Sequence, residues 1–175
     1  MDFLVQRAAG GVEPLIHLTH EPAGIVARVG KGVKGFREGA EGIELARRDS
    51  VALPSFEEHG LRDLVFKPQY ANLQEYLRGF QYTCAVLRKA ENLERVAFEL
   101  AEDSLAEGVR YVEIRFAPQL HVGPELDFSG AVRAVDAGIR RASAAFNARP
   151  EVASGREPRF VAGIILCALR AFTPD

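Results

Sequence analysis

The sequence predicts an α/β fold, in which helices alternate with parallel strands. Two segments have the pattern of buried strands, 108–121 and 160–169, and the second is an almost unbroken apolar run of the kind found in parallel strands covered on both faces. Apolar residues at helical spacing precede each of these segments. Alternating helices and buried strands, joined by right-handed crossovers, are typical of this fold class.

Composition limits both the fold and the class of partner. The chain has 175 residues, of which 47% are hydrophobic and 26% are charged, so it can bury a core and forms one domain or part of one. Its net charge of -2, without a cluster of lysine or arginine, argues against a nucleic-acid partner. Cys84 and Cys167 lie in apolar surroundings and form no CxxC pair, which predicts two reduced, buried thiols.

No stretch of the sequence predicts export or a membrane partner. Residues 1–11 lack the apolar core of a signal peptide, and no apolar run reaches the ~18 residues that a membrane span needs. Together with two reduced thiols, this predicts a cytoplasmic protein.

The first predicted element is a short strand, Pro14–His20, which carries two histidines. Metal-binding histidines on a strand favour positions i and i+2, which share a face, whereas His17 and His20 are three positions apart and face opposite ways in a regular strand. Spacing alone therefore favours one surface histidine and one packed at the strand end over a metal site.

A glycine-rich segment follows, with six glycines between Ala23 and Gly42. It contains a literal GxGxxG at 30–35, after a strand-like stretch, so a phosphate-binding turn has to be considered. That fingerprint needs a helix to open at its last glycine, but Gly39 and Gly42 would each cost the helix about 1 kcal/mol. We therefore interpret the segment as a loop.

Four helices follow from the spacing of apolar residues. The first covers 43–48, and the second is capped by Asn72 and has one apolar face. The third runs from Glu91 to a stop at Gly108, the usual residue after a helix end. The fourth starts at Asp127 or Ser129. The apolar face of the second helix consists of Leu73, Tyr76, Leu77, Phe80, Cys84 and Leu87.

Two segments complete the chain after the third helix. In the strand at 108–121, side chains alternate between faces, so Val112, Ile114 and Phe116 point one way and Tyr111, Glu113 and Arg115 the other. A buried charge is costly alone, so Glu113 and Arg115 should be paired or hydrogen-bonded, as a structural network rather than as catalytic groups. His121 is expected to be an ordinary surface residue. A polar linker at 149–159 then leads to the apolar strand.

These segments carry a resemblance to a known family. The stretches Arg95–Glu99, Gly108–Pro118 and Gly163–Arg170 resemble the amino-terminal half of the adenosine deaminase family, with few gaps from Ile43 to Arg170. The resemblance implies the leading portion of a (β/α)8 TIM-type barrel, with three parallel strands and several helices. It also implies a hydrolase that replaces the 6-amino group of adenosine, or of a related purine nucleoside, by using water activated by one zinc ion.

The resemblance assigns substrate contacts to two places. The helix with Leu73, Tyr76, Leu77 and Phe80 resembles the family's apolar lid over purine and ribose. Leu169, at the end of the last strand, resembles the family's apolar contact to the base, and ligands of such barrels meet the carboxyl ends of the strands. Glu113 and Arg115 resemble structural charges of the family.

The metal-binding strand departs from the family pattern, which is His-x-His followed by an acidic residue and a glycine. Here one extra residue separates His17 from His20. Either Thr19 occupies the second ligand position or Leu18 the first, unless a bulge realigns both histidines as metal ligands. Glu21 corresponds to the family's ribose-binding acidic residue only in the second of these registers.

The chain ends at Asp175, before the family's His-Ala-Gly-Glu motif and its later His and Asp motifs. A zinc hydrolase needs about three protein ligands and a general acid-base group. We therefore assign no catalytic residue and expect residues 1–175 to be an incomplete barrel domain, inactive alone, with a divergent part at 1–42 and a family-like part at 43–175. The alternative is a catalytically incomplete fragment, or a non-enzymatic domain that binds a nucleoside or a partner.

Overall fold

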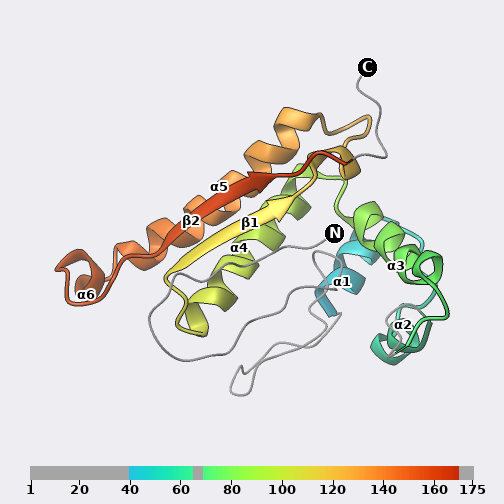
Figure 1. Ribbon diagram of the computed structural model, residues 1–175, viewed down its shortest axis with the longest axis horizontal. Coiled ribbons are helices and arrows are strands. Elements are labelled where there is room, and N and C mark those ends of the chain that lie inside the picture. The colour runs from blue at the N-terminus through green and yellow to red at the C-terminus, as the bar shows by residue number, and fades with distance from the viewer. Residues whose placement is uncertain (1–39, 65–68, 170–175) are drawn as a thin grey trace.

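The computed structural model describes residues 40–64 and 69–169, and all statements about structure refer to these residues. Their elements, in chain order, are α1 (Ala40–Arg48), α2 (Glu58–Leu64), α3 (Leu73–Val86), α4 (Ala90–Ala106), β1 (Tyr111–Phe116), the 3-10 helix η1 (Pro118–Leu120), α5 (Phe128–Asn147), α6 (Pro150–Ala153) and β2 (Val161–Leu166). Figure 1 shows them along the chain.

The two strands are parallel neighbours in one sheet. Their register sets Tyr111 opposite Val161 and Phe116 opposite Leu166. Beyond the paired residues, the Cys167 amide donates to the Phe116 carbonyl at 2.9 Å, so the two chain segments leave the sheet together. The predicted α/β class and parallel pairing are confirmed. The remaining predicted strand, Pro14–His20 near the start of the chain, lies outside the described residues.

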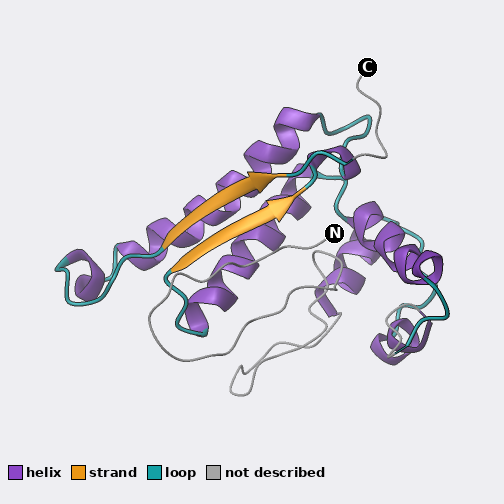
Figure 2. Cartoon of the chain, viewed as in Figure 1, coloured by secondary structure: helices purple, strands orange, loops and turns teal. Residues whose placement is uncertain are grey.

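Helices α4 and α5 cover one face of this sheet (Figure 2). Val112, Ile114 and Phe116 point into that layer and are each 0% exposed, as the alternation predicts. The two helices approach closely at Gly138, where an added Cβ would lie 2.3 Å from the Glu94 carbonyl oxygen. The main core therefore lies between the sheet and this pair of helices.

Local sequence signals fix the helix ends. The Asn72 side chain accepts from the Glu75 amide at 2.9 Å, which confirms the predicted cap of α3. The Asp127 side chain accepts from the Gly130 amide at 2.6 Å and resolves the start of α5 in favour of Asp127. Gly108 follows α4 with a φ of 82°, the left-handed conformation expected of a helix stop.

The predictions for the strand surfaces need correction. Val161 and Ile165 share one face of β2 and are 54% and 38% exposed, so the described residues leave that face uncovered, and Leu166, at the strand end on the other face, is 48% exposed. Glu113 and Arg115 form no ion pair with each other in the structure. Glu113 instead accepts a hydrogen bond from the Tyr111 hydroxyl at 2.9 Å, which satisfies the expectation of a hydrogen-bonded carboxylate.

Two short helices were not predicted. α2 lies in a stretch without a clear apolar period, and α6 lies inside the predicted polar linker, where Pro150 occupies its first turn. Cys84 and Cys167 are free thiols and half-buried, and burial raises the pKa of Cys84. Among the described helices, none has the length and apolar character needed to cross a membrane.

Candidate functional site

The candidate site is the edge of the sheet at which both strands end. Ligands of parallel α/β folds bind at the carboxyl ends of the strands. Leu169 follows β2 at this edge and is half-buried. Helix α3 lies on the side toward which the strand arrows point in Figure 1. The structure therefore brings α3 to the same end of the molecule as Leu169.

His121 connects α3 to this edge. It lies in the segment after β1, and its Nδ1 is 3.1 Å from the carbonyl oxygen of Leu87, the residue after α3. The residue is 3% exposed, and its ring lies 6.0 Å from the ring of Phe116. Burial lowers the pKa of His121 to about 4, so at neutral pH the uncharged ring donates from Nδ1. The expected surface position is therefore wrong, because His121 is a buried anchor.

The predicted lid is described only in part. Leu73, Tyr76 and Leu77 lie in the first turns of α3 by their backbone, and their side chains lie outside the described structure. Phe80 is half-buried on the same helix. The helix is thus confirmed, whereas its contact with a ligand stays a prediction.

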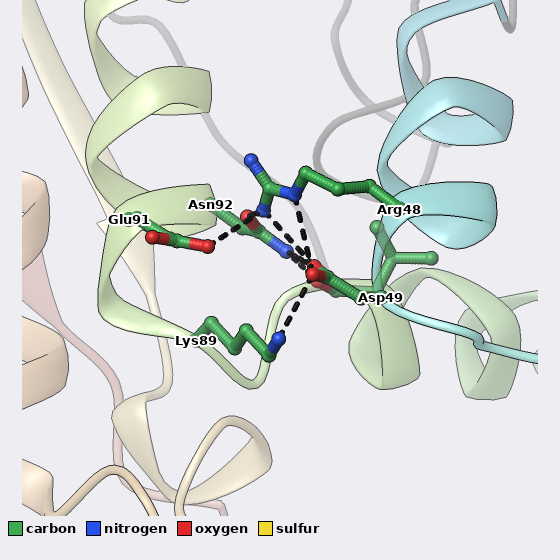
Figure 3. Close-up of polar contacts among 6 residues, drawn as sticks. Arg48, Asp49, Lys89, Glu91 and Asn92 are labelled. Carbon is green, nitrogen blue, oxygen red and sulfur yellow. Dashed lines mark hydrogen bonds and ion pairs between the residues drawn. The ribbon is translucent and has the colours of Figure 1, made fainter.

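A polar network also holds the carboxyl end of α3, and Figure 3 shows its members, Arg48, Asp49, Lys89, Glu91 and Asn92. Asp49, the residue after α1, has a side chain only 6% exposed. It accepts from the Lys89 ammonium at 2.9 Å and from Asn92 Nδ2 at 2.6 Å, and Arg48 pairs with it at 3.0 Å. Hydrogen bonds, first from Arg48 and then from Asn92 and Lys89, hold the pKa of Asp49 well below its usual range. We call this the Asp49 network.

Asn92 extends the Asp49 network to α3. Its side chain is fully buried, and Nδ2 donates to the carbonyl oxygen of Val86, the last residue of α3, at 2.7 Å. Arg48 donates to the amide oxygen on the other side. Sequence reasoning missed these residues, because Asn92 and Asp49 are 43 positions apart and belong to no motif.

The described residues do not supply a metal centre. His17, His20 and Glu21 lie outside them, and within them no group of three or more His, Cys, Asp or Glu side chains has the arrangement to hold a metal ion. His59 is exposed and pairs with Glu57 at 3.1 Å, and His121 is committed to a carbonyl oxygen. No step of a reaction can therefore be assigned to a metal held by this part of the chain.

A hollow of about 400 Å³ lies between α5 and the first residues of β2, lined by Arg140, Arg159 and Val161 among others. Arg159 and Val161 lie at the amino end of β2, opposite the candidate site, and Arg140 belongs to α5. The hollow is therefore separate from Leu169 and α3.

The chain is similar to known proteins of one family. The family model of adenosine deaminase matches residues 40–170. An adenosine deaminase of Clostridium perfringens is 45% identical over 101 residues, which are 57% of this chain and 30% of that protein. A probable adenosine deaminase of Dictyostelium discoideum is 36% identical over 134 residues, which are 76% of this chain and 16% of that protein.

Among solved structures, the crystal structure of an adenine deaminase from Arthrobacter aurescens is similar with a TM-score of 0.49 and 24% identity, covering 73% of this chain and 34% of that one. The matched region thus spans 30% or less of the two curated relatives. Because the family match takes in α3, both strands and the helices between them, the chain belongs to the adenosine deaminase family.

Proposed function

We propose that this chain is the amino-terminal portion of a (β/α)8 enzyme that hydrolytically deaminates adenosine or a related purine nucleoside. In that reaction the oxygen of water replaces the 6-amino group, and ammonia leaves. The observation that carries the proposal is the family match over 40–170, which includes the parallel pair β1 and β2. The proposed domain is an incomplete barrel over 1–175, with 43–175 family-like and 1–42 divergent.

In the proposal, α3 and the end of β2 form the apolar wall against the purine. Leu73, Tyr76, Leu77 and Phe80 would cover the nucleoside from α3, and Leu169 would contact the base. The anchoring of α3 to the strand ends through His121 supports this arrangement, since it sets the helix at the edge where ligands bind.

The proposed cofactor is one zinc ion, with His17 and His20 as two of its ligands and Glu21 near the ribose. Bound zinc would supply an activated water, and the present chain would contribute binding and orientation of the purine. The proposed location is the cytoplasm.

Two measurements on the purified chain test the proposal. Calorimetric titration should show saturable binding of adenosine and none of cytidine, because the apolar wall is built for a purine. Leu169→Glu should abolish the adenosine signal, whereas Leu64→Glu, at a 58% exposed position on α2, should leave it unchanged. Equal binding of both nucleosides by the chain would contradict the substrate class.

The second measurement follows turnover and metal content. Adenosine absorbance should stay constant with the chain alone, because none of its residues is assigned as the general acid-base group. Zinc analysis of the chain and of a His17→Ala, His20→Ala double variant tests the metal ligands. Equal zinc content in the two proteins would remove both histidines from the proposal.

A second candidate function is a binding domain without activity. The exposed apolar positions of β2, Val161, Ile165 and Leu166, favour it, because such surfaces mark contacts with other polypeptides. The nucleoside titration separates the two, since a domain of this kind that binds only a polypeptide shows no adenosine signal.

A further inference from the structure

We propose that Asp49 is a positioning residue: through Asn92 it fixes the carboxyl end of α3 and so sets where the apolar wall lies. This inference rests on the proposed function for the role of α3, and on the hydrogen bonds of the described residues for the role of Asp49. Asp49 accepts hydrogen bonds from Lys89 and Asn92, and Asn92 in turn donates to Val86 of α3. The effect of Asp49 on a ligand therefore has to pass through α3.

The carboxyl end of α3 needs hydrogen-bond donors from elsewhere in the chain. The last four carbonyl groups of a helix have no partner within it. The Val86 carbonyl finds a donor in Asn92 Nδ2 at 2.7 Å, and the next carbonyl, that of Leu87, finds one in His121 Nδ1 at 3.1 Å. Two consecutive carbonyls are therefore held by two different elements, α4 and the segment after β1.

Asp49 determines which way the Asn92 amide points. An Asn side chain has two N–H donors, and here one goes to Val86 and the other to Asp49 Oδ2 at 2.6 Å. Arg48 donates to the amide oxygen, so the orientation of the amide is fully specified. Without the carboxylate, a fully buried donor of Asn92 loses its acceptor, and rotation of the side chain withdraws the bond to Val86.

A small tilt of α3 at its carboxyl end produces a large displacement of its first turn. α3 has 14 residues, so it is about 21 Å long, and a tilt of about 10° at Val86 displaces its first turn by about 4 Å. The first turns carry Leu73, Tyr76 and Leu77. Since misplacement of about 1 Å can already weaken a site severely, the anchor controls the wall at a distance.

Amide hydrogen exchange on the purified chain tests the anchor. The Leu87 amide, which donates to Thr83, reports on the end of α3, and the Val161 amide, which donates to Arg110, reports on the sheet. In Asp49→Ala we expect exchange at Leu87 to accelerate about tenfold more than at Val161, because the loss of a buried hydrogen bond is local. Asp49→Asn keeps an acceptor for Asn92 and should restore about half of the logarithmic change.

The matched control comes from the same network. Glu91 pairs with Arg48 at 2.9 Å, but its side chain is 64% exposed and this ion pair does not involve Asn92, so Glu91→Gln should leave both amides unchanged. Equal acceleration at Leu87 and Val161 in Asp49→Ala would overturn the proposal, because it reports only a loss of global stability. If Asp49→Ala does not fold, the comparison of Asp49→Asn with Glu91→Gln decides the same question.

Adenosine titration of the same proteins links the anchor to the site. We expect the dissociation constant to rise about tenfold in Asp49→Ala, less in Asp49→Asn and not at all in Glu91→Gln. Locally faster exchange with unchanged adenosine affinity would overturn the positioning role. Locally faster exchange in proteins that never bind adenosine would support the anchor and contradict the proposed function, so the two failures are distinguishable.

Discussion

At the scale of single residues, His121 makes the stability of the chain depend on pH. Its folded-state pKa of about 4 lies below the usual value of about 6.5, so between these values the unfolded chain binds a proton that the folded chain excludes. We predict that the contribution of His121 to the free energy of unfolding is constant above pH 6.5. Between pH 6.5 and 4 this contribution should fall by roughly 3 kcal/mol. Urea unfolding across this range measures it.

The variant His121→Gln isolates this contribution, because a glutamine amide can still donate to the Leu87 carbonyl but does not titrate. Its stability curve should be flatter than that of the wild type over the same range. The titration of Asp49 does not affect this comparison. The lowered pKa of Asp49 adds stability that is present above the ordinary pKa of 3.8 and is lost only at lower pH. Parallel curves for the two proteins would show that His121 is not the titrating group.

A second residue-scale prediction concerns Ser50, which follows α1 with a φ of 56°. An L-residue loses about 1 kcal/mol or more in this left-handed conformation, and glycine does not. Ser50→Gly should therefore stabilise the chain by about 1 kcal/mol in urea unfolding. Ser154→Gly is the control: Ser154 has a φ of -82°, so the same change should destabilise. A loss of stability at both positions would count against the strain at Ser50.

At the scale of elements, the contact between α4 and α5 predicts an exception to the usual helix propensities. Glycine to alanine normally stabilises a helix interior by about 1 kcal/mol. At Gly138 the new methyl group would lie 2.3 Å from the Glu94 carbonyl oxygen and 2.9 Å from the Ala97 Cβ, so the helices must separate. We predict that Gly138→Ala destabilises by about 1–3 kcal/mol in thermal unfolding. Gly123→Ala, with open space around it, is the control and should change stability little.

The elements also show how far the sequence predicts this fold. α3, α4, α5 and both strands have repeated apolar spacing and clear end signals such as Asn72, Asp127 and Gly108, so each could be located from local patterns. α2 and α6 have 7 and 4 residues, which is too short for a period to repeat. Local signals therefore missed the helices of two turns or fewer.

The candidate site was less predictable for a different reason. Its anchors join residues far apart in sequence: His121 to Leu87 across 34 positions, and Asn92 to Asp49 across 43. No spacing rule links such pairs, and an isolated asparagine is usually exposed, whereas histidine is intermediate in burial. The predicted site residues His17, His20 and Glu21 lie outside the described structure, so those assignments stay predictions.

At the scale of the whole molecule, α4 and α5 cover one face of the sheet, and no described helix covers the other face (Figure 2). The run from Val161 to Leu166 is apolar at every position other than Gly163, a composition suited to a strand buried on both faces. Yet Val161 and Ile165 on the open face are 54% and 38% exposed. Together, pattern and exposure indicate that this face is suited to contact with further apolar residues.

This open face leads to a prediction about association. An exposed apolar face promotes association between chains, and a lysine within it opposes association. The isolated chain should therefore self-associate with rising concentration in sedimentation velocity, and Ile165→Lys should shift it toward the monomer without loss of thermal stability. Ile164→Lys is the control, because Ile164 packs against the core and a charge there should unfold the chain. A wild-type chain that stays monomeric at every concentration would contradict the prediction that this face associates.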